Sequence, residues 1–89
     1  MSALRKLTEN FIATTVDDEV LIVDLDGGEL FSLTGTARSV WEAIDGSRDE
    51  GAIAQLMAER HEGDADRIAA DVAALVRDFE DAALVAPTR

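Results

Sequence analysis

The segment from Val20 to Gly46 changes its hydrophobic period within a few residues, and this change limits the fold more than any other feature. Its first part, VLIVDL followed by the turn DGG and then ELFSL, is typical of two strands. Its second part carries apolar residues at three- and four-residue spacing, which predicts a helix containing Ala37, Val40, Trp41 and Ile44. We therefore expect a hairpin followed directly by a helix.

The turn at Asp26 to Gly28 decides which side chains of the hairpin share a face. A two-residue loop divides the apolar positions between both faces. A three-residue loop, with Gly28 in the left-handed conformation, instead aligns Leu21, Val23, Leu25, Phe31 and Leu33 toward the core. We favour this second loop, which leaves Val20, Ile22 and Leu30 facing outward, where they could serve a homodimer or a partner enzyme.

A further strand and two further helices complete the pattern. Residues Asn10 to Thr15 read as a strand that turns at Asp17-Asp18 and pairs with the run beginning at Glu19. Thr34 is suited to cap the first helix, and Asp45-Gly46 to end it.

The second helix begins at Ser47 or Asp49, with Ile53, Leu56 and Met57 as its buried stripe. The third begins at Asp64 or Asp66 and reaches about Ala83, with an apolar side made of Ile68, Val72, Leu75, Val76 and Phe79. The fold class is therefore α+β: a three-stranded antiparallel sheet followed by three helices, in the manner of a winged helix-turn-helix. We expect one domain over residues 1–89, with its core between about 11 and 85.

Composition excludes several classes of function. Eight basic and nineteen acidic residues give a net charge of -11, which opposes binding to nucleic acid or to an anionic membrane. Such a surface either keeps the protein soluble or matches a basic partner. The chain has no cysteine, no apolar run like that of a signal peptide and no membrane-spanning segment, so we expect a cytoplasmic location.

No catalytic, metal-binding or cofactor-binding pattern is found. His61 is the only histidine and is expected at the surface. The acidic clusters do not follow an EF-hand loop, and Gly27-Gly28 lacks the lysine of a phosphate-binding loop. We therefore expect no enzyme and no cofactor. Two alternatives stay open: a winged-helix DNA-binding regulator, which the charge opposes, and an acidic carrier protein, which lacks the expected D-S-L triplet.

The segments GGELFSLTGTARSVWEAIDG and DADRIAADVAALVRDFEDAALV together resemble the PqqD family, also called the RiPP recognition element. The resemblance covers roughly Phe11 to Val85. It rests on Leu33 eight residues before Trp41, on Asp45-Gly46 shortly afterwards, and on Asp71-Val72 in the last helix. The chain departs from the family pattern in having Thr34 in place of Asn and Ala37 in place of Gly.

The resemblance implies a peptide chaperone that binds the leader segment of a ribosomally made precursor and presents it to a modifying enzyme, such as a radical enzyme, a cyclase or a protease. In that family the leader adds a strand beside the third strand and lies against the third helix. The implied peptide-binding residues here are Glu29, Leu30, Phe31, Ser32, Leu33, Arg67, Asp71, Ala74, Leu75 and Asp78.

The residues themselves offer a physical basis for this mode. A short last strand followed directly by a helix leaves one row of backbone donors and acceptors open to another chain. The alanines of the third helix, at 69, 70, 73 and 74, either keep it slim enough for a peptide to approach or simply favour the helix.

Overall fold

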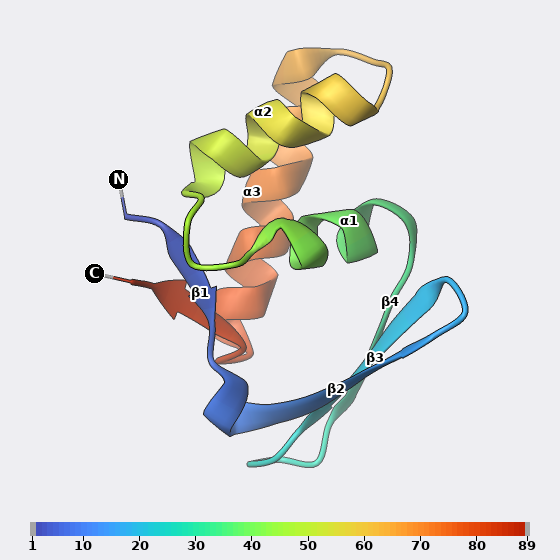
Figure 1. Ribbon diagram of the computed structural model, residues 1–89, viewed down its shortest axis with the longest axis vertical. Helices are drawn as coiled ribbons and strands as arrows, with labels where there is room; N and C mark the ends of the chain where they lie inside the picture. The colour runs from blue at the N-terminus through green and yellow to red at the C-terminus, as the bar shows by residue number, and fades with distance from the viewer. Residues whose placement is uncertain (1, 89) are drawn as a thin grey trace.

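The computed structural model describes residues 2–88 and confirms the predicted fold class, a three-stranded antiparallel sheet followed by three helices. The helices lie together on one side of this sheet, and the two ends of the chain run side by side (Figure 1). The elements in chain order are β1 (Leu4–Lys6), the 3-10 turn η1 (Thr8–Asn10), β2 (Phe11–Val16), β3 (Glu19–Asp24), β4 (Leu30–Leu33), α1 (Gly35–Ala43), α2 (Glu50–Arg60), α3 (Ala65–Asp81) and β5 (Val85–Pro87).

The hydrogen bond that closes the β3–β4 hairpin encloses a loop of four residues, so the predicted three-residue loop is wrong. The amide of Asp24 donates to the carbonyl of Glu29 at 2.8 Å, and the loop runs from 25 to 28. The Asp24 carboxylate accepts hydrogen bonds from the amides of residues 26 and 27, at 3.1 and 3.2 Å, which folds the chain back one residue earlier. Gly28 has a φ of 73°, as expected.

This one-residue difference exchanges the two faces of β3, because successive side chains of a strand point to opposite sides. Val20 and Ile22, predicted to face outward, are 3% and 0% exposed. Val23 and Leu25, predicted to face the core, are exposed, and Leu21 is half-buried. On β4 the prediction is confirmed: Leu33 is buried, Phe31 packs against the core and Leu30 faces outward.

A second, two-stranded sheet joins the ends of the chain, and the sequence analysis placed no strand there. β1 pairs antiparallel with β5, with Leu4 opposite Pro87 and Lys6 opposite Val85. Leu4 and Val85 are buried, so the core extends beyond the expected N-terminal limit. Strands of three residues are too short to show an alternating pattern, which explains why they were missed.

The core is centred on Trp41, which the helical spacing placed correctly. Its ring lies between those of Phe11 and Phe79, with centroids 5.3 Å apart and edge-to-face geometry in both pairs. The Lys6 ammonium lies 5.0 Å from the centroid of the Trp41 ring. Burial lowers the pKa of Lys6, and the carboxylates of Asp45 and Glu42 oppose this shift. These contacts join both sheets and two helices through one indole.

Two of the three helix starts are capped by aspartates. Asp49 accepts from the amide of Ala52 at 2.8 Å, and Asp64 accepts from the amide of Asp66 at 3.0 Å. Of the two alternative starts for each helix, α2 therefore begins at Asp49 and not at Ser47, and α3 begins at Asp64 and not at Asp66. Thr34 occupies the predicted N-cap position of α1, but its side chain makes no capping hydrogen bond.

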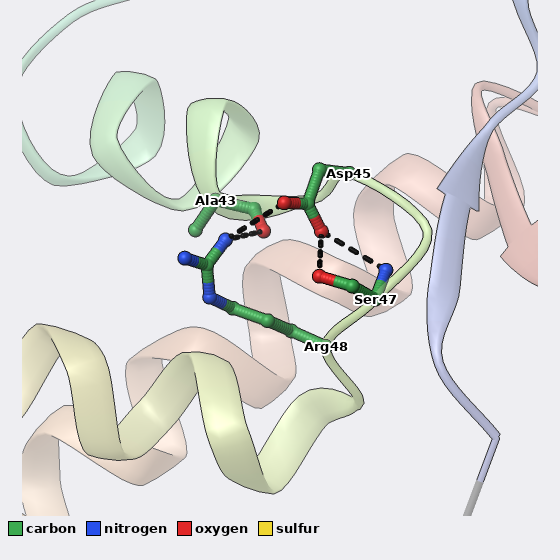
Figure 2. Close-up of polar contacts among 4 residues, drawn as sticks. All are labelled: Ala43, Asp45, Ser47 and Arg48. Carbon is green, nitrogen blue, oxygen red and sulfur yellow. Dashed lines mark hydrogen bonds and ion pairs between the residues drawn. The ribbon is translucent and has the colours of Figure 1, made fainter.

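The turn between α1 and α2 is held by a network centred on Asp45 (Figure 2). One carboxylate oxygen accepts from the amide and hydroxyl of Ser47, at 2.9 and 2.6 Å, and the other pairs with the Arg48 guanidinium at 3.1 Å. Arg48 also donates to the carbonyl of Ala43 at 3.0 Å. The hydrogen bonds from Ser47, with the nearby Arg48, lower the pKa of Asp45.

Candidate functional site

The outer edge of β4 is free in the part of the chain that the structure describes. β4 pairs with β3 on one side only, and the N-terminal strand pairs with β5 instead of covering this edge. Hydrogen-bonded pairs alternate along an antiparallel ladder. Since Asp24 is bonded to Glu29, the next bonded pair is Ile22 with Phe31. The backbone N–H and C=O groups of Leu30 and Ser32 therefore point away from β3, toward the free edge.

Helix α3 and strand β4 run in opposite directions (Figure 1). A hollow of about 430 Å³ is lined by Glu29, immediately before β4, and by Asp81 and Ala82 at the end of α3. A second hollow of about 420 Å³ is lined by Thr36, shortly after β4, and by Arg67 near the start of α3. We call these the Glu29 hollow and the Arg67 hollow. The beginning of β4 is therefore near the end of α3, and the residues just after β4 are near the beginning of α3.

An apolar seam lies between the two hollows. Ile68, Leu75 and Ala82 are spaced seven residues apart along α3 and so share one face of the helix. All three are partly buried against the core, as is Phe31 of β4. The edge strand and this face of the helix therefore border the same core, and the parts of these side chains that stay exposed are apolar. The seam is defined by Phe31, Ile68, Leu75 and Ala82.

Charged side chains border the seam on α3. Asp71 and Asp78 are exposed and lie three residues beyond Ile68 and Leu75, which places them on the adjoining side of the helix. Arg67 and Asp71 line the Arg67 hollow together with Ile68. A chain lying along the seam would therefore meet apolar groups in the middle, carboxylates along one margin and a guanidinium at one end.

The structure thus gathers most of the expected residues around one strip of surface. Leu33 is buried and can act only through its backbone. Ala74 is exposed but precedes Leu75 by one position, so it lies on a different side of the helix from the seam. The Ser32 hydroxyl donates to the Glu19 carboxylate on the outer face of the sheet. Sequence reasoning missed Ile68 and Ala82 as site residues, although their seven-residue spacing from Leu75 was a usable signal. Met57, which lines the Arg67 hollow from α2, had no such signal.

His61 lies where the sequence placed it, exposed at the end of α2. It lines the Arg67 hollow together with Glu62 and Asp64. Within residues 2–88, no helix is both long enough and apolar enough to cross a membrane.

The fold and the free edge define a small winged-helix-like module with an open sheet margin beside its last helix. The family model of PqqD, described as coenzyme PQQ synthesis protein D, matches residues 19–85, about three quarters of the chain. This chain therefore belongs to the PqqD family. No curated protein matches its sequence.

Two solved structures share the fold. A structure of TbiB1 in complex with the TbiA(beta) leader peptide has a TM-score of 0.80 at 19% identity, over 90% of this chain and 93% of that chain. A structure of lasso peptide synthetase B1 complexed with the leader peptide has a TM-score of 0.82 at 20% identity, over 97% of this chain and 100% of that chain.

Proposed function

We propose that this chain is a non-enzymatic module that binds the leader segment of a ribosomally made precursor peptide and presents it to a modifying enzyme. The observation that carries the proposal is the free edge of β4 beside the apolar seam. Membership of the PqqD family supports it, as do two structural neighbours that were solved with leader peptides.

The leader would bind by strand addition. Its backbone would pair with the N–H and C=O groups of Leu30 and Ser32, and its alternate side chains would point into the seam toward Phe31 and Leu75. Backbone pairing is the same for every sequence, so the seam and its charged border would provide the specificity.

The expected affinity is micromolar. Four or five backbone hydrogen bonds at about 1 kcal/mol each and two or three apolar anchors at about 2 kcal/mol each give a gross gain of about 10 kcal/mol. Association and the ordering of a flexible leader reduce this gain by several kcal/mol. The carboxylates bordering the seam would favour basic residues in the leader.

A proline at position 32 tests strand addition directly. Because the Ser32 amide points toward the free edge, Ser32→Pro removes a donor that the leader would use without removing a bond to β3. Ser32→Ala is the matched control, since it also loses the hydroxyl contact with Glu19 but keeps the amide. The probe is the synthetic leader of a candidate precursor, chosen by inspecting the genes that neighbour this one, and binding is measured by titration calorimetry.

We expect Ser32→Pro to weaken leader binding at least tenfold and Ser32→Ala to change it by less than about threefold. Thermal melts of both variants verify that they are folded. Equal leader affinity in a folded Ser32→Pro variant would contradict binding at this edge.

A further inference from the structure

The outer face of the three-stranded sheet carries a row of exposed apolar side chains. Ile12 lies opposite Val23, and Val23 lies opposite Leu30, so one residue from each strand stands in line across the sheet. They are 59%, 39% and 63% exposed. Val16 and Leu25 extend this side of the sheet, and these five are the exposed large hydrophobic residues within 2–88. We call this surface the outer sheet face.

Acidic residues surround the outer sheet face. From Phe11 to Leu33 the chain has six carboxylates and no lysine or arginine. Asp17 and Asp18 form the turn at one end of the sheet, and Asp26 lies in the loop at the other end. Contiguous apolar surface with a polar rim is typical of an interface between proteins.

The charge of the rim selects the kind of partner. A second copy of this chain, placed face to face, would bring this acidic rim against an identical acidic rim, and Arg38, which lies near the rim, already pairs with Asp18 at 3.6 Å. A partner with an apolar centre and a rim of lysine or arginine would complement both the row and its border. We propose that the outer sheet face is the docking surface for the modifying enzyme, and that the enzyme presents such a basic-rimmed apolar patch.

This inference rests on the proposed function and extends it, because the added leader strand would enlarge the same surface. In a pleated sheet, the side chains of a strand that pairs with β4 alternate between the two faces. Leader residues beside Leu30 and Ser32 would therefore project onto the outer sheet face. The enzyme would contact the module and the leader together, and would bind the complex more tightly than the free module.

The test uses a purified candidate modifying enzyme, chosen by inspecting the genes that neighbour this one, with the module saturated by a synthetic leader that it binds. The variant is Ile12→Thr with Val23→Thr, because threonine retains the β-branched shape that suits a strand while removing apolar surface. The control is Ala13→Ser, which lies next to Ile12 and is also exposed, but whose side chain belongs to the opposite face of the sheet.

We expect the double variant to raise the Kd for the enzyme roughly tenfold, with leader affinity changed by less than about twofold. Ala13→Ser should leave both affinities unchanged, and higher salt should slow association with the enzyme. Unchanged enzyme binding by the double variant would overturn the proposal, as would a wild-type complex that binds no enzyme. A wild-type dimer that the double variant dissociates, seen by analytical ultracentrifugation, would identify a second copy as the occupant. A wild-type protein that does not bind the leader at all would instead refute the proposed function.

Discussion

Phe31 on β4 lies directly opposite Ile22 on β3, and the alternation of the antiparallel ladder makes this pair, like Leu33 with Val20, a hydrogen-bonded one. The same pairing turns the backbone groups of Leu30 and Ser32 toward the open margin. Adjacent residues of β4 therefore differ in whether their amides are bonded within the free protein. This difference allows strand addition to be examined residue by residue.

Amide hydrogen exchange should report the binding of a leader at this edge. In the free protein we expect fast exchange at Leu30 and Ser32 and slower exchange at Phe31 and Leu33. Saturation with the synthetic leader should slow exchange at Leu30 and Ser32 by roughly tenfold or more, because their amides would gain partners. Exchange measured by NMR that slows only on α3, with β4 unaffected, would place the leader elsewhere.

Charge reversal beside the Arg67 hollow should weaken leader binding without unfolding the protein. Arg67 and Asp71 are exposed and line this hollow together, so Arg67→Glu or Asp71→Arg changes its charge and not the core. Exposed charge pairs contribute up to about 1 kcal/mol, which predicts a loss of affinity up to roughly fivefold. Arg77→Glu, on the same helix but outside the seam, is the control. Unaltered affinity in both variants, measured by calorimetry, would reject this position for the leader.

The Asp45 network should make stability depend on pH. Because its pKa is lowered in the folded state, the stabilising contribution of Asp45 is complete above its ordinary value of 3.8 and is lost as pH falls through the lowered value. Asp45→Asn mimics the protonated form and should reduce Tm at pH 7, with a smaller reduction near pH 3. Circular dichroism melts at the two pH values provide the measurement, with Glu59→Gln on α2 as a control. An equal reduction at both pH values would contradict this role.

A glycine at position 83 should stabilise the fold. Ala83 has a φ of 60° where α3 ends, and its amide and that of Leu84 donate to the carbonyls of Glu80 and Phe79. The left-handed conformation costs alanine about 1–2 kcal/mol, and the greater freedom of glycine in the unfolded chain offsets part of that gain. Ala83→Gly should raise the free energy of unfolding by about 1 kcal/mol in urea titrations. A variant less stable than wild type would show that Ala83 is unstrained.

Much of the fold follows from local patterns in the sequence. The 3.6-residue period placed Trp41, Val72 and Phe79 in the core, and the acidic caps at Asp49 and Asp64 were among the starts considered. These features depend on residues within a few positions of one another. The last strand and the final helix were identified in the same way, and they form most of the candidate site.

The tertiary structure decided what short-range patterns leave undetermined. The carboxylate of Asp24 selects a four-residue loop, and this choice buries Ile22 and exposes Val23, because a shift of one residue exchanges the faces of a strand. The pairing of β1 with β5 joins residues more than seventy positions apart. The sequence alone thus determined the order and type of the main elements, since these depend on neighbouring residues. The orientation of β3, the route of the chain ends and the position of β4 beside α3 depend on contacts between distant segments, and only the folded protein defines them.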